Sequence, residues 1–457
     1  MAHHPWPPRP APFAQSRRGR RYSRRVAREA WRPFDCRLTR PPTGKGRRSG
    51  EWQFGERFGE GSVNGQVNGQ VNGQAASPAA ARRTTTPVSV AIDATPLVGS
   101  RTGVGAFTLG ILHALAARPD VEAAGYALSW RAWRSLATAL PPGVRHLRRS
   151  MPPQPLRACW LRFDGPPAEW WTGDVEVVHG TNFVVPPTRD AAAVMTIHDL
   201  TPERFPELCS GDPLFYPQLL RRQLERGAWA HTVSQFVADE VVELLGADPE
   251  RVVVVPEAVP PVADAEPEEG RRLAGAERYV LALSTVEPRK DHLSLVRAFD
   301  RVAAGHPDLR LVIAGMEAWG SDRLDRAVAD TRHPDRITRL GYVSDGHRAA
   351  LLRGASVLAF PSRYEGFGLP PLEAMAAGVP VVATTAGSLP EVLGDAALLV
   401  PVGDDGALAD ALDATLAADG LRDRLVAAGL EQAARYSWER SASGLVDLYR
   451  RAARSES

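Results

Sequence analysis

The chain has 457 residues, enough for two ordinary domains, and its net charge of +2 is unevenly distributed. Residues 1–50 hold 14 Lys and Arg against 2 Asp and Glu, whereas the remaining 407 residues hold 41 against 51 and carry a net charge of −10. A mildly acidic body argues against a protein that binds nucleic acid.

Residues 1–87 are rich in Arg, Pro and Gly and contain the polar repeat VNGQVNGQVNGQ at Val63–Gln74. Such a segment buries too little apolar surface to offset the entropy lost on ordering, so we predict a disordered basic tail. The run RRGRRYSRR at Arg17–Arg25 could contact anionic lipid or RNA, but a solvated run without a specific partner is the favoured interpretation. An alternative is a protein that begins further along the chain.

The three cysteines, Cys36, Cys159 and Cys209, lie far apart and lack the spacing of metal ligands, which fits a reducing compartment. No apolar run approaches the ~20 residues that a membrane-spanning helix needs. The first residues are positively charged without an apolar core, so we do not expect a secretory signal. We therefore expect a cytoplasmic protein, and peripheral contact with the inner face of the membrane stays open.

The first predicted unit, residues 88–262, opens with a buried strand at Val88–Ala94. The loop TPLVGSRTGVG follows, and then a helix from about Ala106 to Ala117. The sequence of strand, glycine-containing loop and helix is typical of the start of a Rossmann-like unit. Gly103 and Gly105 close the loop and are candidates for ligand binding, although a tight turn without a ligand is an equal alternative.

Two further strands are predicted at Val175–His179 and Ala192–His198. The second ends in TIHDL, so His198 and Asp199 lie at the carboxyl end of a strand, where open α/β sheets bind ligands. We hypothesise that His198 lines a ligand cleft; the alternative is a histidine that caps a turn through Asp199. Further along, Ser234 is predicted to cap the next helix.

A proline-rich, acidic linker is predicted at Pro260–Gly270, before a second unit over residues 271–437. This unit opens with a strand at Tyr279–Thr285, the loop VEPRKDH and a helix. Arg289 and Lys290 are adjacent cations in that loop, and such a pair can neutralise the charge that grows on a diphosphate leaving group. The alternative is a solvated surface pair.

The most informative segment is Pro361–Val400, in which Glu365 and Glu373 flank the turn EGFGLPP before a predicted helix at Pro371–Ala377. Glu365 is placed in the loop and Glu373 in the first helical turn. Three backbone amides are predicted to form a phosphate seat at the helix N-terminus, those of Phe367, Gly368 and Leu369. A phosphate seat between two carboxylates fits a ligand with a diphosphate and hydroxyl-rich rings, such as a nucleotide-sugar. The alternative is two surface glutamates near a loop.

These residues also resemble a known family. EGFGLPPLEA, with the flanking FPS and GSLPE, is similar to the Glu-x7-Glu signature of the retaining glycosyltransferases of family four, also called group 1, which have the GT-B fold. The resemblance covers most of the chain from about Ser89 onward. It implies an α/β protein of two Rossmann-like domains facing across a cleft, with an N-terminal acceptor domain over 88–262, a nucleotide-sugar domain over 271–437, and a last helix at about 438–454 that returns to the first domain.

The resemblance also implies roles for particular residues. Glu373 would hold ribose hydroxyls and Glu365 the hydroxyls of the transferred sugar. The residues implied in catalysis are Glu365, His198, Arg289 and Lys290. Those implied in donor binding are Gly103, Gly105, Arg289, Lys290, Phe367, Gly368, Leu369 and Glu373. This chain departs from the family at Ala106, in GVGAFT, where relatives often have an arginine.

The implied reaction is the transfer of a hexose, with retention of configuration, from a nucleoside diphosphate to a hydroxyl of a glycan, lipid-linked or small-molecule acceptor. GDP-mannose is the first candidate donor and a UDP-sugar the second. We expect no cofactor and no metal, because the sequence has no Asp-x-Asp after a strand, no paired cysteines and no His-x-x-His. The alternatives are a nucleotide-sugar epimerase or hydrolase, and a non-catalytic GT-B scaffold.

Overall fold

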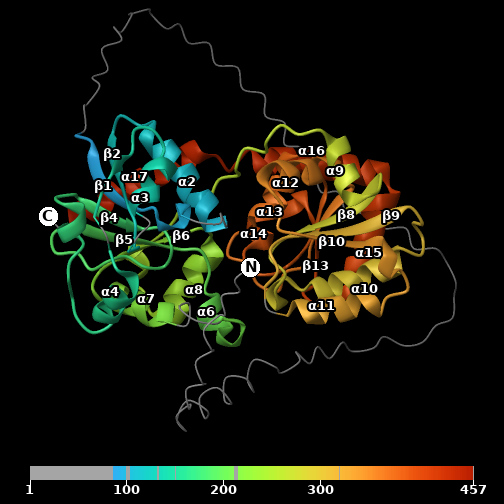
Figure 1. Ribbon diagram of the computed structural model, residues 1–457, viewed down its shortest axis with the longest axis horizontal. Helices are drawn as coiled ribbons and strands as arrows, with labels where there is room; N and C mark the ends of the chain where they lie inside the picture. Colours follow the sequence, from blue (N-terminus) through green and yellow to red (C-terminus); the bar gives the residue numbers. More distant parts are fainter. Residues whose placement is uncertain are drawn as a thin grey trace, which may run out of the picture. The chain divides into compact units, whose positions relative to one another are not determined.

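A computed structural model of the chain describes residues 86–455, apart from 99–102, 131–132, 150, 210–214 and 319. Residues 1–85 of the predicted tail, and Cys36 with them, lie outside the described residues. The described part contains two parallel β-sheets with helices packed on them, which confirms the predicted α/β fold of two Rossmann-like sheets (Figure 1).

The first sheet has seven strands in the order β3-β2-β1-β4-β5-β6-β7, and its recorded pairings are parallel. Strands of parallel sheets are buried on both faces, and the sequence VSVAID of β1 fits this, since only Ser89 is not fully buried. The strands are β1 Val88–Asp93, β2 Val121–Tyr126, β3 Arg145–His146, β4 Val177–Gly180, β5 Ala192–Ile197, β6 Trp229–Thr232 and β7 Val252–Val254.

The second sheet has six strands in the order β10-β9-β8-β11-β12-β13, again paired in parallel. Its strands are β8 Arg278–Leu283, β9 Leu309–Ala314, β10 Ile337–Gly341, β11 Val357–Phe360, β12 Val381–Thr384 and β13 Leu398–Val400. In each sheet the strand order reverses once, between β1 and β4 in the first and between β8 and β11 in the second. The loops that leave the carboxyl ends of these two strand pairs are where open α/β sheets bind ligands.

The helices of the first sheet are α2 Gly103–Ala116, α3 Trp133–Ala139, α4 Pro153–Trp160, α5 Glu169–Thr172, α6 Thr201–Arg204, α7 Tyr216–Glu225 and α8 Gln235–Leu245. Those that follow are α9 Pro267–Ala274, α10 His292–Val302, α11 Ser321–Ala329, α12 Asp345–Gly354, α13 Leu369–Ala376, α14 Leu389–Leu393, α15 Asp405–Ala417, α16 Asp419–Ala433 and α17 Trp438–Ser455. Ser234 caps α8 as predicted, because its side chain accepts a hydrogen bond from the amide of Val237.

The last helix packs on the first sheet. One buried cluster joins Ile92 of β1, Ile111 of α2 and Leu445 of α17. The hydroxyl of Tyr449 lies 2.7 Å from Nδ1 of the buried His179 in β4. In Figure 1 the red helix α17 accordingly lies among β1, β4 and α2. The first sheet therefore needs the last segment of the chain to cover one of its faces.

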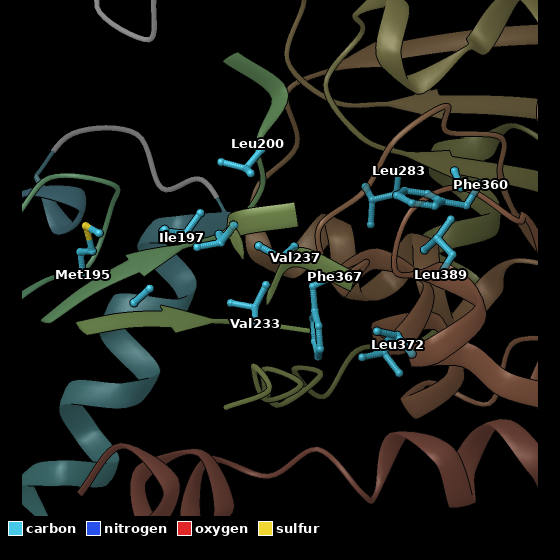
Figure 2. Packing of buried hydrophobic residues seen from close by; sticks show 14 of the residues in the cluster. Met195, Ile197, Leu200, Val233, Val237, Leu283, Phe360, Phe367, Leu372 and Leu389 are labelled. Atoms are coloured by element: carbon cyan, nitrogen blue, oxygen red, sulfur yellow. The ribbon is translucent and has the colours of Figure 1, made fainter. Parts of the chain in front are cut away.

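A second buried cluster includes side chains from elements of both sheets. Figure 2 shows Phe367, from the turn before α13, between Val233 and Val237 on one side and Leu372 and Leu389 on the other. Burial of an aromatic ring here stabilises the glycine-rich turn, because the ring removes a large apolar area from water.

Three helix starts differ from the predictions. Helix α2 begins at Gly103 rather than about Ala106, so both glycines belong to its first turn and do not close a loop. Helix α9 begins at Pro267, inside the predicted linker, because proline suits the first turn and Arg271 and Arg272 suit the last. Helix α13 begins at Leu369, which puts Glu373 in its second turn and not its first.

Among the described residues, no helix combines the length and the apolar character needed to cross a bilayer. Cys159 and Cys209 are free thiols.

Candidate functional site

The loops after β8 and β11 bring two cations and a carboxylate together at the point where the strand order of the second sheet reverses. Nζ of Lys290 lies 2.5 Å from Oε1 of Glu365, and Nη1 of Arg289 lies 3.4 Å from Oε2 of the same carboxylate. Glu365 is buried, so it depends on these partners to compensate its charge. Arg289, Lys290 and Glu365 come from segments far apart in the sequence, and the structure brings their side chains into contact.

Arg289 is held by its neighbours as well as by Glu365. It donates from Nη1 to the carbonyl oxygen of Tyr364 at 2.8 Å, and its Nη2 lies 2.8 Å from Oε1 of Glu287. Its Nε also donates to Oε1 of Glu287, at 3.1 Å, so the N–H groups that can turn toward an anion are the second one of Nη2 and the one that now faces Glu365.

Lys290 is oriented by an unusual backbone conformation next to it. Asp291 has φ of 48°, in the left-handed region, which aspartate tolerates because its short side chain bonds locally. Asp291 caps α10, because its side chain accepts hydrogen bonds from the amide and the hydroxyl of Ser294. The same carboxylate accepts a hydrogen bond from Nε of Arg363 at 2.9 Å. The ammonium group of Lys290 then lies 5.2 Å from the centre of the Phe360 ring.

Burial and charge compete at this cluster. Burial raises the pKa of Glu365, but the charges of Lys290 and Arg289 outweigh it and hold that pKa below its usual range. Burial lowers the pKa of Lys290, and the neighbouring positive charge of Arg289 adds to this while Glu365 opposes it. A doubly charged anion placed beside the two cations would favour their charged forms, so the cluster is suited to a phosphate-bearing ligand.

The turn after Glu365 also contacts elements of the first sheet. A Cβ at Gly366 would lie 1.7 Å from the carbonyl oxygen of His198, so only glycine fits there. The hydroxyl of Ser234, the cap of α8, donates to the carbonyl oxygen of Gly366 at 2.7 Å. The backbone beside Glu365 is thus fixed against the loops after β5 and β6.

The predicted phosphate seat lies at the N-terminus of α13. Gly368 is the residue before the helix, has φ of 104°, and no side chain caps the helix. Pro370 and Pro371 have no N–H, so the nearby amide donors are those of Phe367, Gly368 and Leu369. An uncapped helix N-terminus carries partial positive charge and suits an anion. Phosphate binding at these three amides stays a prediction.

Glu373 lies apart from the cation cluster in its contacts. It is buried, and its Oε2 is paired with Nη2 of Arg348 of α12. Burial raises the pKa of Glu373, and the charge of Arg348 opposes this only in part. The predicted role of Glu373 in holding ribose hydroxyls stays a prediction.

His198 has both ring nitrogens engaged. Nδ1 lies 2.7 Å from Oε1 of Glu257, and Nε2 lies 2.9 Å from the carbonyl oxygen of Thr181, to which it must donate. Burial lowers the pKa of His198, but the hydrogen bond and charge of Glu257 outweigh it and raise that pKa above its usual value. A charged imidazolium that donates at both nitrogens would fix the loop after β5. Its predicted catalytic role stays a prediction.

The predicted roles of Gly103 and Gly105 also stay predictions. Gly103 is exposed, and a Cβ added to it would meet nothing within 4 Å, so space alone does not require glycine there. Among the described residues, no group of three or more His, Cys, Asp and Glu side chains could hold a metal ion.

Several supporting residues received no role from the sequence. The amide and hydroxyl of Ser388 donate to the carbonyl oxygen of Glu365 at 3.0 and 3.2 Å, and Gly387 leaves room for this contact. The hydroxyl of Tyr364 accepts from the amide of Leu200 and lies 2.5 Å from Oε2 of the buried Glu240. Ser388 lies inside the GSLPE segment and Tyr364 directly precedes Glu365, so their place in these motifs is the signal for their role.

Comparison with known proteins identifies the family. A model of the glycosyl transferases group 1 matches residues 266–432, and a model of Glycosyltransferase Family 4 matches residues 101–262. The chain is 33% identical over 285 residues to the O-antigen chain mannosyltransferase B of Escherichia coli, covering 60% of this chain and 74% of that protein. It is 41% identical over 174 residues to the phosphatidyl-myo-inositol mannosyltransferase of Mycobacterium leprae, covering 37% of this chain and 46% of that protein.

Solved structures share the fold. HepE from Anabaena, in complex with UDP and glucose, matches with a TM-score of 0.61 at 17% identity, covering 79% of this chain and 98% of that one. Sucrose-phosphate synthase from Thermosynechococcus elongatus matches with a TM-score of 0.60 at 19% identity, covering 80% and 98%. The fold is therefore GT-B, and the chain belongs to the group 1, family 4 glycosyltransferases, enzymes that transfer a sugar.

Proposed function

We propose that the chain is a retaining, metal-independent hexosyltransferase that takes its sugar from a nucleoside diphosphate and passes it to a hydroxyl of a glycan, lipid-linked or small-molecule acceptor. The observation that carries the proposal is the contact of Lys290 and Arg289 with the single buried carboxylate of Glu365. GDP-mannose is the first candidate donor, which the similarity to two mannosyltransferases supports. UDP-sugars are the second candidate donors, because cations that bind phosphate oxygens do not distinguish one nucleobase from another.

The two cations stabilise the departing diphosphate. As the bond between the anomeric carbon and the phosphate oxygen breaks, negative charge grows on that oxygen, and donors already in place stabilise it without reorganisation. Arg289 offers two N–H groups in a fixed fork, and Lys290 acts as a point charge. The amides before α13 would take a second set of phosphate oxygens at the helix N-terminus.

Glu365 changes partners when the donor binds. In the structure its oxygens are taken by Lys290 and Arg289. A diphosphate would draw these cations toward its own oxygens and leave the carboxylate able to accept from sugar hydroxyls. The acceptor hydroxyl then attacks from the face that the phosphate leaves, and its proton goes to the leaving phosphate, so the configuration is retained.

The proposal also gives Glu373 a role in donor binding and requires no divalent metal. Paired with Arg348, Glu373 is held in one orientation and would accept from the ribose hydroxyls. Because Arg289 and Lys290 supply the positive charge, a divalent metal is not required, and transfer should persist in excess EDTA.

A panel of GDP-, UDP-, ADP- and TDP-sugars in thermal-shift assays would identify the donor, and NMR of the product would give its anomeric configuration. Replacing one of the two cations, in Arg289→Ala or Lys290→Ala, should lower the turnover by about 10²–10³-fold, since each acts on charge that develops in the transition state. Arg297→Ala, which removes a half-exposed cation of α10, is the matched control and should stay near wild type. Full activity in both site variants would contradict the proposal, and release of free sugar without transfer would favour a hydrolase.

A further inference from the structure

Glu373 of α13 is a buried carboxylate whose recorded ion pair is with one residue, Arg348 of α12. Glu373 is 3% exposed, and its neighbours Leu372 and Ala374 are fully buried. Its Oε2 is paired with Nη2 of Arg348, whereas no hydrogen bond from a described residue to its Oε1 is recorded. A buried carboxylate in apolar surroundings is costly unless an opposite charge compensates it, so the ionised form of Glu373 depends on Arg348.

The carboxylate of Glu373 is directed toward the N-terminus of its helix. Glu373 lies four residues after Leu369, the first residue of α13, so the two share one side of the helix. Four residues rise by about 6 Å along the axis, and helical side chains lean toward the N-terminus. The diphosphate of the donor is proposed to bind at that end of α13. The ribose that follows the diphosphate therefore comes within reach of the free oxygen of Glu373.

Helix α12 is firmly anchored, so Arg348 extends from a fixed backbone. A Cβ at Gly270 of α9 would lie 2.0 Å from the carbonyl oxygen of Ala350, which shows how closely α9 and α12 pack. The buried hydroxyl of Tyr279 in β8 donates to the carbonyl oxygen of Leu351 at 2.6 Å. The side chain of Arg348 is 31% exposed, at the edge of this packed face. Its position is thus set by α12 and its charge partner by α13.

The charges that act on Glu373 come from α12. Burial raises the pKa of Glu373, the charge and hydrogen bond of Arg348 lower it, and the charge of Asp345 raises it further. Strands β11 and β12, which also contact α13, have no ionisable side chains. Helix α16 packs against Met375 through Gly429, and its charged residues are exposed. Those exposed residues are Asp419, Arg422, Asp423, Arg424 and Glu431.

We propose that Arg348 is a positioning residue for the donor, which keeps Glu373 ionised and aimed at the ribose and so sets the preference of the enzyme for ribonucleotides over deoxyribonucleotides. The proposal rests on the proposed function, since it requires a nucleotide at the second sheet. An ionised carboxylate accepts at both oxygens, whereas a protonated one loses an acceptor position and must place its own proton. Loss of the charge of Arg348 should therefore weaken recognition of the ribose hydroxyl groups.

Four variants separate the charge of Arg348 from its packing. Arg348→Met and Arg348→Gln remove the charge and keep much of the side-chain length, and the glutamine can still donate a hydrogen bond. Arg348→Lys keeps the charge and is the conservative rescue. Arg353→Met is the matched control, because it removes a cation of the same helix that lies 3.6 Å from the exposed Asp264.

The test is calorimetric titration of the full chain with GDP, UDP and the 2′-deoxy and 3′-deoxy forms of each, between pH 6 and pH 9. For the nucleotide that the wild type binds more tightly, the deoxy dissociation constant is divided by the ribo one. At pH 7 we expect this ratio to be about tenfold or more for at least one deoxy form, as loss of a hydrogen bond to a charged group implies.

In Arg348→Met and Arg348→Gln the ratio should fall toward one at pH 7 and recover as the pH rises to 9. The reason is that loss of the positive charge raises the pKa of Glu373 further, so the ionised carboxylate, and with it the discrimination, is lost at a higher pH than in the wild type. Arg348→Lys and Arg353→Met should keep the wild-type ratio at pH 7.

A wild type that does not discriminate, a wild-type ratio in both neutral variants, or an equal loss in Arg353→Met would overturn the proposal. A loss that does not recover at high pH would also overturn it, because a merely structural role lowers the melting temperature without moving the pH profile. If Arg348→Met does not fold, Arg348→Gln, which retains an amide donor for Glu373, decides the test.

The two proposals fail in different ways. If neither GDP nor UDP binds the wild type, the proposed function is wrong, and the role of Arg348 is wrong with it. If one of them binds and the neutral variants discriminate as the wild type does, the function stands and only the role of Arg348 is wrong.

Discussion

The reversals of strand order in the two sheets hold different chemistry at equivalent positions. In the second sheet, Lys290 and Arg289 share the carboxylate of Glu365, so these buried charges compensate one another. In the first sheet, Asp93 lines a small pocket, and the hydrogen bonds recorded to it from side chains and amides of the described residues reach one of its two oxygens. The two reversals therefore differ in how their buried carboxylates are compensated, and the difference lies in a few residues at and after the strand ends.

Loss of Lys290 should destabilise the protein more than any other substitution considered below. Lys290→Met removes the cation but keeps most of the side-chain volume, and it leaves the buried Glu365 with the more distant Arg289 as its ion-pair partner among the described residues. Breaking a buried ion pair from one side typically costs about 3–5 kcal/mol, so the free energy of unfolding in urea should fall by that order.

The double variant Lys290→Met, Glu365→Gln should recover most of this loss, because the stranded charge is gone, yet it should not recover transfer. If Lys290→Met proves as stable as wild type, the ion pair does not compensate Glu365 in solution.

The free energy of unfolding should depend on pH through Asp93 of the first sheet. The pKa of Asp93 is about 6 in the folded chain against 3.8 unfolded, so the folded state holds an extra proton between these values. The stability that this proton contributes is present below about pH 4 and is lost as the pH rises through 6, for a total of about 3 kcal/mol at 1.36 kcal/mol per unit.

Asp93→Asn removes this dependence. The unfolding free energy of the variant relative to wild type should rise between pH 4 and pH 7, measured by urea titration at each pH. A difference that stays flat across this range would show that Asp93 is not a buried, poorly compensated carboxyl.

The contact between the turn after Glu365 and the loop after β5 gives a third test. Gly366→Ala would force a methyl group to within 1.7 Å of the carbonyl oxygen of His198, and relief of such overpacking typically costs about 1–3 kcal/mol. The melting temperature and the affinity for the donor should both fall. Gly103→Ala, where a Cβ meets nothing, is the matched control for stability and should keep the wild-type melting temperature.

The sequence predicts the site at the second sheet better than it predicts the site at the first. EGFGLPPLEA and EPRK predicted the second site because its residues lie in short, continuous motifs and because both motifs leave strands, so the parallel sheet brings Arg289, Lys290 and Glu365 together. The prediction placed Glu373 in the first turn of its helix, but α13 already includes Leu369 and Pro370, so Glu373 lies in the second turn. Helix starts are fixed by backbone geometry that the residue pattern specifies only loosely.

The pocket at Asp93 could not be predicted in the same way. Its partners Asn182 and Arg157 come from distant segments, and only the order of the strands places them together. A signal was nevertheless present, since Asp93 directly ends the buried strand VSVAID, where ligand-binding residues of such sheets occur. The pairing of His198 with Glu257, 59 residues further on, depends equally on strand order.

The contact between α14 and the N-terminus of α8 should contribute least to stability. Glu391 of α14 accepts from the amides of Gln235 and Phe236, at 2.8 and 3.0 Å, at the N-terminus of α8. Glu391→Gln removes a negative charge from a helix N-terminus, which is worth about 0.3–1 kcal/mol. The melting temperature should fall slightly at low salt and less at high salt, and a salt-independent change would show that charge is not what the contact contributes.

Calorimetric titration of GDP, with UDP in parallel, into the wild type, Lys290→Met and Asp93→Asn tests whether the donor binds at the second sheet. We expect Lys290→Met to weaken binding of the preferred nucleotide by about tenfold or more, because a buried cation is lost from the diphosphate, while Asp93→Asn binds as the wild type does. Wild-type affinity in Lys290→Met, or an equal loss in Asp93→Asn, would contradict the assignment of the donor to the second sheet.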